Sequence, residues 1–360
     1  MLNGIKIVEI EGLGPAPFAG MMLADLGAEV TVIHRAGKSA GITAEASLLD
    51  RGKRSIALDL KNVEDLAVAK ALITQADGLI EGFRPGVMER LGLGPELCHA
   101  DNPKLVYGRM TGWGQSGPRA HQAGHDLNYI ATSGALYYAG LPDDTPVTPA
   151  TLLGDIGGGA LYLVAGMLAG IIKSARTGQG TVVDAAIVDG SAHMMNLLMA
   201  LGQGGGLSEE RGASLLDGPH WSRSYRCACG GDVSVQALEP QFYAALLTAL
   251  DLSDDPRMQA QHDAGQWGTQ TARLGAVFLE KSRANWMAHF DGSDACVAAV
   301  LSPKTAAEEP HMKARNVWDS AQGYLQAAPA PRFDGHSAPI NIATPRDADR
   351  AAILAELDLQ

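Results

Sequence analysis

The first 110 residues alternate between short apolar runs rich in β-branched residues and longer stretches whose apolar residues recur at helical spacing. Five runs are typical of strands: IKIVEI (5–10), EVTVIHR (29–35), SIALDL (55–60), GLIEGF (78–83) and KLVYGR (104–109). Helices are predicted between them, at 16–27 and 63–76. Strands separated by helices run parallel, so the pattern predicts an α/β fold with a doubly wound, mainly parallel (Rossmann-like) sheet. TVVDAAIVD (181–189) is expected to add a later strand.

The pattern changes in the second half of the chain. SYRCACGGDVSVQAL (224–238) predicts two strands around a Gly-Gly turn, and a helix should begin at Pro240. With a helix at 284–290 and a strand at 294–301, these elements predict a smaller α+β domain. The expected organisation is a large domain (1–188), a linker (189–221), the small domain (222–305), a second linker (306–333) and a C-terminal helix that returns to the large domain (334–360).

The charge balance excludes some classes of partner. The formal net charge is −12 and the pI is about 5.2, which argues against nucleic acid and anionic membranes as partners. The apolar run at 156–172 is short for a membrane span and rich in glycine, so we expect a buried core helix and no membrane insertion. No secretory signal is recognisable, and the four cysteines lack a CxxC pair. We therefore expect reduced thiols, no metal site and a cytoplasmic location.

The basic residues indicate where a phosphate could bind. GLG (12–14) follows the first strand, but Pro17 replaces the third glycine of a dinucleotide fingerprint, so that signal is weak. Arg35 ends the second strand, where it suits an NADP-type ligand or the 3′-phosphate of coenzyme A. Arg84 in GFRPG follows another strand, and Arg90 lies about two turns further on. A further cluster is either a polyanion site or a solvated positive face: Lys38, Arg51, Lys53, Arg54 and Lys61.

His125 and Asp155 are candidates for acid–base chemistry. His125 lies in the polar stretch HQAGHDLNYI, and Asp155 opens an apolar helix in LLGDIGGGALYL. Read alone, the histidine suits a surface loop and the aspartate suits a helix N-cap. The glycines at 157–159 favour chemistry, because a helix N-terminus without side chains can expose N–H groups to a developing oxyanion. A base, a carboxylate and an oxyanion donor together fit proton removal next to a thioester carbonyl.

Motifs along nearly the whole chain resemble the α-methylacyl-CoA racemases of the family III CoA-transferase superfamily. They are ADLGAEVTVIHR, RGKRSIALDLK, EGFRPGVMERLGLGP, RMTGWGQSGPRAHQAGHDLNYI, GDIGGG, GQGTVVDAAIVDG and LEPQFY. GFRPG and RMTGWGQSGP are typical of the superfamily, whereas GHDLNY together with GDIGGG points to racemases. The resemblance implies a cofactor-independent isomerase of lipid metabolism that acts on acyl-CoA. It also implies an interlocked homodimer with shared active sites.

The resemblance assigns roles to individual residues. His125 and Asp155 would exchange the α-proton on opposite faces of a 2-methylacyl-CoA, through an enolate. Glu239, which alone reads as a helix cap or a surface carboxylate, would hydrogen-bond Asp155 of the other chain and share a proton with it. The residues that would contact CoA or line the thioester are Arg35, Leu58, Asp59, Leu60, Lys61, Gly82, Phe83, Arg84, Arg90, Gly124, Asp126, Leu127, Asn128 and Tyr129.

Three functions stay open at this point. The first is the racemase, and the second is a CoA-transferase in which Asp155 is a nucleophile that forms an acyl anhydride. The third is a non-enzymatic acyl-CoA binding protein, which would have no use for His125 and Asp155 together. His125 favours the racemase, because transferases of the superfamily generally lack it. The acyl chain stays open among branched fatty, bile-acid and arylpropionyl groups, and His220 and Trp221 depart from the usual pattern in a stretch that bears on that choice.

Overall fold

The computed structural model describes residues 1–37 and 47–358, and the chain forms two compact units. The large unit comprises Met1–Ala135, Pro149–Met194 and His311–Gln360. The second unit comprises Leu136–Thr148 and Met195–Pro310. Each unit buries its own apolar residues, so each has a hydrophobic core of its own.

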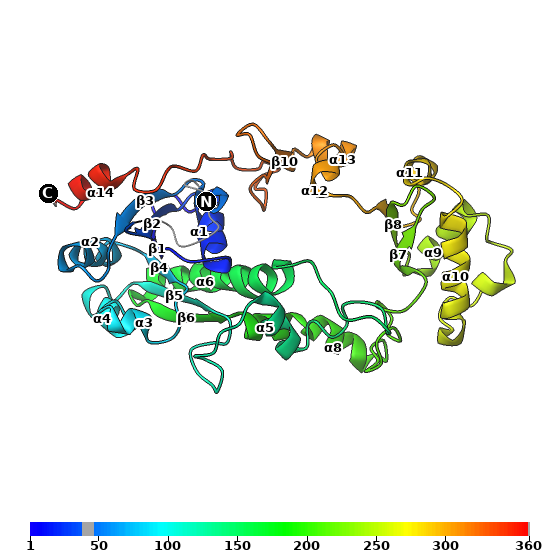
Figure 1. The fold of residues 1–360 in the computed structure, drawn as a ribbon, viewed down its shortest axis with the longest axis horizontal. Helices are drawn as coiled ribbons and strands as arrows, with labels where there is room; N and C mark the ends of the chain where they lie inside the picture. Colours follow the sequence, from blue (N-terminus) through cyan, green and yellow to red (C-terminus); the bar gives the residue numbers. More distant parts are fainter. Residues whose placement is uncertain (38–46, 359–360) are drawn as a thin grey trace. The chain divides into compact units, whose positions relative to one another are not determined.

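The large unit is built on a six-stranded sheet in which all strands run parallel (Figure 1). The strands are β1 (Lys6–Ile10), β2 (Glu29–Arg35), β3 (Arg54–Leu58), β4 (Gly78–Glu81), β5 (Val106–Thr111) and β6 (Thr181–Ala186). Their order in the sheet is β3-β2-β1-β4-β5-β6. The order reverses between β1 and β4, and ligands of open α/β sheets bind at such a point. The predicted doubly wound parallel sheet is confirmed.

Helices cover both faces of this sheet. Successive strand residues point to opposite faces, so Ile7 packs in one core with α1 and α6 while its neighbour Val8 packs in another with α2. The helices of the large unit include α1 (Pro15–Asp25), α2 (Val63–Thr74), α3 (Val87–Arg90), α4 (Pro95–Asp101), α5 (Asp126–Ser133), α6 (Leu161–Thr177), α7 (Ile187–Met194) and α14 (Arg350–Glu356). Local signals set their starts. Pro15 is the first residue of α1, and the Asn62 side chain caps α2 by accepting from the N–H of Glu64 at 2.8 Å.

The apolar helix predicted at 156–172 packs on the sheet through its glycines. A Cβ at Gly166 would lie 2.5 Å from Val183, and one at Gly170 would lie 2.5 Å from Val106. The combined helix Leu152–Thr177 is long and apolar enough to span a membrane by length and composition alone, but its inner face forms part of the core. The prediction of a buried helix holds for that face only, because Leu161 and Ile172 are 43% and 59% exposed.

The strand predicted at 181–189 is too long. β6 ends at Ala186 and α7 begins at Ile187, where the N–H of Val188 donates to the carbonyl of Gly112 at 3.1 Å. Gly190 lets α7 approach the chain around Gly158, because a Cβ at Gly190 would lie only 1.9 Å from the Gly158 carbonyl oxygen. The apolar composition of residues 187–188 suits a strand, but the close packing of α7 on the chain around Gly158 makes these residues helical.

The second unit has a three-stranded antiparallel sheet in the order β7-β8-β9. Its strands are β7 (Ser222–Arg226), β8 (Asp232–Gln236) and β9 (Val297–Ala299), and its helices include α8 (Asn196–Gln203), α9 (Pro240–Ala249), α10 (Trp267–Phe278), α11 (Arg283–Phe290) and α12 (Pro303–Ala306). The predicted Gly-Gly hairpin is confirmed, with Gly230 at a φ of 78° and the N–H of Cys227 donating to the Gly231 carbonyl at 2.8 Å. Aromatic side chains dominate the core of this unit, Trp221 and Phe278 being fully buried.

The unit limits differ from the predicted domain limits. Residues 136–148, predicted in the large domain, belong to the second unit, where the hydroxyl of Tyr137 donates to the Glu209 carbonyl at 2.7 Å. Residues 311–333, predicted as a linker, pack with the large unit, where Arg51 donates to the Ala327 carbonyl at 2.8 Å. The predicted linker 189–221 begins inside α7 and contains α8. These limits are set by contacts between segments that are far apart in the sequence. Such contacts produce no local sequence pattern from which the limits could be predicted.

We predict that Gly190→Ala destabilises the large unit. The added methyl would overlap the Gly158 carbonyl, and overpacking of this kind costs about 1–3 kcal/mol. Urea unfolding followed by circular dichroism should show a lower midpoint. Ala192→Ser, at an exposed position of the same helix, is the matched control and should change stability by less than about 0.5 kcal/mol. An unchanged midpoint for Gly190→Ala would contradict the close approach of α7.

Candidate active site

One carboxylate joins the two segments that carry the predicted acid–base pair. His125 is the exposed N-cap of α5, and Asp155 lies in a π-helical segment, Leu152–Ala160, which leads into α6. Asp126, next to His125, is only 7% exposed. Its Oδ1 accepts from the N–H of Gly154 at 2.9 Å and of Asp155 at 2.8 Å, and its Oδ2 accepts from Thr151 at 3.2 Å. The structure therefore brings His125 and Asp155 together through Asp126.

Asp155 has an unusually basic carboxylate. Burial is the largest cause, and the negative charge of Asp126 adds to it, so that the pKa of Asp155 rises to about 6 although His125 acts in the opposite direction. The turn after β1 also reaches this carboxylate, because a Cβ at Gly14 would lie 3.5 Å from Asp155 Oδ2. A group with a pKa near 6 can both accept and return a proton close to neutral pH.

The glycines at 157–159 serve packing, and the predicted anion site at this helix start is not supported. A Cβ at Gly158 would lie 2.3 Å from Ser191 Oγ, and one at Gly159 would lie 2.9 Å from Ile187. Near the start of the segment, the N–H groups of Gly154 and Asp155 already donate to Asp126. These glycines allow α7 to approach the segment that holds Asp155.

The first turn of α5 has the free N–H groups instead. The N–H of His125 donates to Asn128 Oδ1 at 3.0 Å, and the carbonyl of His125 accepts from Asn128 and Tyr129. Among the residues that the structure describes, the N–H groups of Asp126 and Leu127 donate to no protein group. They lie beside His125 at a helix N-terminus, where a negative oxygen is stabilised.

Tyr129 packs beneath the turn that carries His125. It is 8% exposed, its hydroxyl donates to the carbonyl of Gly124, and its ring meets Trp113 edge to face at 4.8 Å. Gly112 leaves room for the ring, because a Cβ there would lie 1.9 Å from it. Burial raises the pKa of Tyr129, the Asp155 charge raises it further and Arg84 lowers it, so the hydroxyl stays protonated between them.

Three of the stretches predicted to bind CoA begin at the carboxyl ends of neighbouring strands of the sheet. Arg35 ends β2, Leu58 ends β3, and Gly82 follows β4, and these strands lie together around β1. Arg35 and Leu58 are direct neighbours in the β2–β3 pairing. Of the predicted residues, the exposed ones are Arg35, Asp59, Lys61, Gly82, Arg84, Arg90, Leu127 and Asn128, those partly buried are Leu60, Phe83 and Gly124, and those buried are Leu58, Asp126 and Tyr129.

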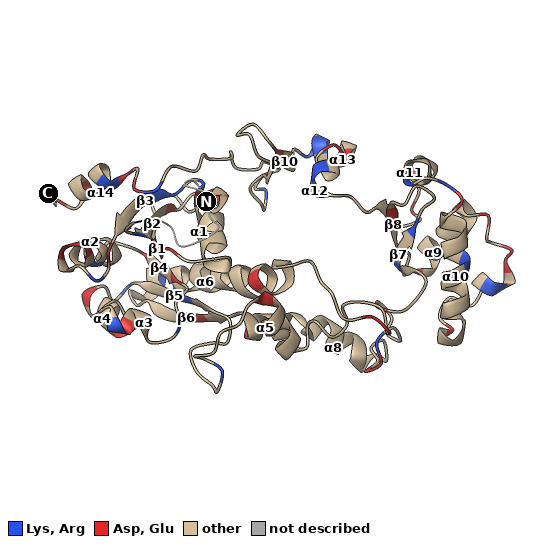
Figure 2. Cartoon of the chain, viewed as in Figure 1, with Lys and Arg blue, Asp and Glu red and all other residues tan. Residues whose placement is uncertain are grey.

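Most of the described basic cluster is used in structural ion pairs. Arg51 Nη2 lies 2.5 Å from Asp25 Oδ2, Lys53 Nζ lies 2.7 Å from Glu9 Oε2, and Arg54 Nη1 lies 2.8 Å from Glu356 Oε2. Figure 2 shows basic and acidic segments together around β1, β2 and β3. Lys38 lies outside the described residues. Each of these three cations already has a carboxylate partner. Among the described residues of the cluster, only Lys61 therefore keeps the polyanion interpretation.

A buried ion pair that the sequence analysis missed supports the GFRPG loop. Glu81, at the end of β4, is fully buried, and its Oε2 accepts from the N–H of Phe83 at 2.7 Å while its Oε1 accepts from Arg109 at 3.0 Å. Arg109 also donates to Glu89 at 2.8 Å. Burial raises the pKa of Glu81 to about 7 despite these bonds. The sequence signal for this buried ion pair is the charged residue at the end of the otherwise apolar strand GLIE.

The remaining predicted residues lie in the second unit. Glu239 is the exposed N-cap of α9, and its carbonyl accepts from Tyr243 at 2.9 Å. His220 and Trp221 are fully buried in the core, where His220 Nε2 lies 2.8 Å from the Tyr243 hydroxyl. Burial lowers the pKa of His220 to about 4, so this histidine stays neutral. Both residues therefore belong to the packed core of this unit.

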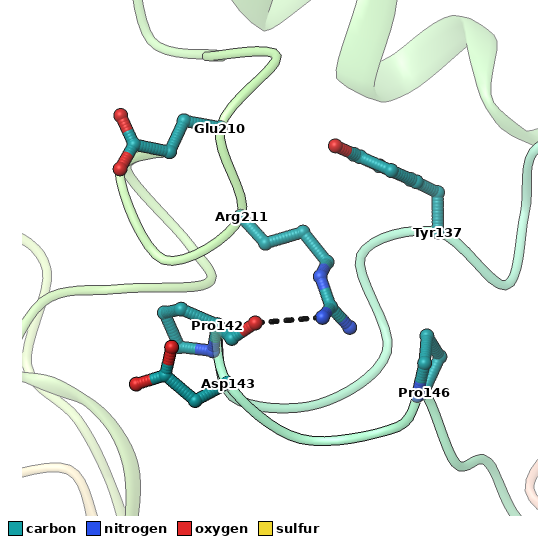
Figure 3. Close-up of a pocket in the computed structure, with 6 residues that line it drawn as sticks. All are labelled: Tyr137, Pro142, Asp143, Pro146, Glu210 and Arg211. Atoms are coloured by element: carbon teal, nitrogen blue, oxygen red, sulfur yellow. Dashed lines mark hydrogen bonds between the residues drawn. The ribbon is translucent and has the colours of Figure 1, made fainter.

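Other features of the structure do not coincide with this site. A hollow of about 520 Å³ in the second unit is lined by Tyr137, Pro142, Asp143, Pro146, Glu210 and Arg211 (Figure 3). Arg211 crosses it and donates to the Pro142 carbonyl at 2.7 Å, and no predicted site residue lines it. Within residues 1–37 and 47–358, no group of three or more His, Cys, Asp or Glu side chains could hold a metal ion.

Similarity to known proteins covers most of the chain. The family model for CoA-transferase family III matches residues 2–350. The chain is 41% identical to the mouse protein named alpha-methylacyl-CoA racemase over 88% of this chain and 81% of that protein, and 40% identical to the human one over 92% and 86%. A crystal structure of a CAIB/BAIF family protein from Brucella suis is 27% identical, with a TM-score of 0.82 over 99% of both chains. The chain therefore belongs to CoA-transferase family III.

Proposed function

We propose that this protein interconverts the (R) and (S) forms of 2-methylacyl-CoA thioesters by moving the α-proton. The observation that carries the proposal is the carboxylate of Asp126, which ties the turn of His125 to the backbone of Asp155. One of the two groups removes the α-proton to give an enolate, and the other returns a proton to the opposite face. The substrate loses one proton to one group and gains one from the other, so no second substrate is needed.

The enolate oxygen has donors available. The N–H groups of Asp126 and Leu127, at the start of α5, stand next to His125 and could donate to the thioester oxygen as it becomes negative. Arg35, Lys61, Arg84 and Arg90 are exposed and suit the phosphates of CoA. No cofactor or metal is proposed, because acidity comes from the thioester and proton transfer from side chains. The cytoplasmic location stays a prediction.

We further propose that the protein acts as an interlocked homodimer. The outer face of α6 exposes Leu161 and Ile172, and no residue of α8 is buried, with Leu197 70% exposed. Apolar faces of this kind are typical of protein interfaces. In such a dimer, Glu239 of one chain would meet Asp155 of the other and share a proton with it.

The first test is α-proton exchange. A single enantiomer of a 2-methylacyl-CoA in D2O should gain deuterium at the 2-position while the enantiomers equilibrate, measured by NMR and chiral analysis. His125→Ala should lower the rate by about 10²–10⁴-fold, the worth of positioned general acid–base catalysis. His121→Ala, in the same loop and exposed, is the matched control. Transfer of CoA to an added carboxylate without deuterium uptake would show instead that Asp155 is a nucleophile.

The second test concerns pH. In the direction in which Asp155 accepts the proton, kcat/KM should fall as the pH drops through its pKa of about 6. Asp126→Asn keeps an oxygen that can accept hydrogen bonds but removes the charge that raises this pKa, so the fall should occur at lower pH. Asp101→Asn, an exposed carboxylate at the end of α4, should leave the profile unchanged. An acid limb that does not move in Asp126→Asn would contradict the role of the Asp126 charge.

The third test is subunit mixing. Asp155→Ala and Glu239→Gln chains are co-expressed with different tags, and the heterodimer is isolated. If the sites are shared, one site carries both changes and the other is intact, so about half of the wild-type activity should return, which is simple counting for a dimer with closed two-fold symmetry. A heterodimer no more active than its parents would show that Glu239 serves its own chain or is not needed.

A further inference from the structure

We propose that Glu11 and Arg346 are positioning residues for Arg35, so that the C-terminal segment 345–350 forms part of the acyl-CoA site. The inference rests on the proposed function and extends the substrate site to residues from the two ends of the chain. It concerns affinity for CoA, and it leaves the acid–base pair unchanged.

Both backbone polar groups of Arg35 are held by one ion pair. The N–H of Arg35 donates to Glu11 Oε2 at 2.7 Å, and its carbonyl accepts from Arg346 Nη2 at 2.9 Å. Arg346 in turn donates to both carboxylate oxygens of Glu11, from Nη2 at 3.1 Å and from Nη1. The side chain of Arg35 is exposed and has no ion-pair partner among the described residues. The pair thus fixes the backbone of Arg35 and leaves its guanidinium free.

Glu11 is charged in this arrangement. Burial acts to raise its pKa, but the nearby His34 and the hydrogen bonds from Arg346 and the Arg35 N–H outweigh burial and hold the pKa well below its usual range. His34 Nδ1 lies 3.4 Å from Glu11 Oε1, so buried His34 closes the other side of the carboxylate. A carboxylate with this many donors has little freedom to move, so the Arg35 backbone that it holds is fixed as well.

The segment that carries Arg346 is fixed to the edge strand β3. Asp349 Oδ2 accepts from the N–H of Ser55 at 2.9 Å, and Asp347 Oδ1 accepts from the N–H of Ala57 at 2.7 Å. Ala57 precedes Leu58, where the second predicted CoA-binding stretch begins, and the N–H of Ala36 donates to the Leu58 carbonyl at 3.1 Å. Segment 345–350 therefore contacts the backbone of Arg35 and the backbone of Ala57, directly before the stretch that begins at Leu58.

Loss of Arg346 alone should leave the segment in place. The side chains of Asp347 and Asp349 hold it at β3, and Arg54 pairs with Glu356 on α14, further along the chain. A variant at Arg346 should then release the Arg35 backbone while the fold persists. Glu356→Gln is the matched control, since it weakens another contact of the C-terminal segment without touching Arg35.

The test measures CoA binding by titration calorimetry and turnover with acyl-CoA. Arg346→Ala and Glu11→Gln should each raise the Kd for CoA by about tenfold, the equivalent of 1.4 kcal/mol. KM should rise in parallel, with kcat at saturation nearly unchanged. Glu356→Gln should bind as the wild type does. In an Arg35→Ala background, Arg346→Ala should have no further effect on Kd, because it acts through Arg35.

Each outcome decides a separate question. If the wild type does not bind CoA, the proposed function fails. If the wild type binds CoA and Arg346→Ala binds it equally well, the positioning role is wrong. If Arg346→Ala weakens binding as much without Arg35 as with it, Arg346 contacts CoA directly or disturbs the fold, and the inference is overturned. Rescue of tight binding by Arg346→Lys with an unchanged melting temperature would support a held backbone over a loss of stability.

Discussion

The carboxylate of Asp126 is the interaction on which the site depends. A buried charge is costly unless donors satisfy it, and three backbone N–H groups at the start of the Asp155 segment do so. The same bonds satisfy helix-start N–H groups that would otherwise be buried without a partner. Because Asp126 is also the first residue of α5, one group sets the position of His125 relative to Asp155 and raises the basicity of the latter.

The packing around this carboxylate explains why the chain is so rich in glycine there. The wide turns of the π-helical segment need neighbours at close range, and Gly158 and Gly190 let α7 approach to backbone contact. Gly112 accommodates the ring of Tyr129 in the same way. A site that holds an ionisable group near neutral pKa needs a dry and rigid surrounding, and the glycines provide it by removing side chains that would separate the helices.

The sequence predicted those features that repeat locally. The alternation of strands and helices gave the parallel sheet, and the positions of Arg35 and Gly82 after strands were enough to place them at one sheet edge. It did not predict contacts between distant residues. In the sequence, Arg51 and Lys53 suggest a cationic patch. The fold pairs them with the carboxylates of Asp25 and Glu9, which are distant in the sequence. The packing role of the glycines at 157–159 could not be predicted for the same reason, because their neighbours lie about 30 residues further on, in α7.

Segment 345–350 covers the exposed edge of the six-stranded sheet. β3 is an edge strand, and its free N–H groups at Ser55 and Ala57 are satisfied by the side chains of Asp349 and Asp347 in place of a seventh strand. This covers an edge that could otherwise pair with another chain. The covering segment also carries Arg346 to Glu11, so the same residues cover the edge of the sheet and hold the Arg35 backbone. Protection of the edge and the geometry of the predicted CoA-binding residues therefore depend on one docking event.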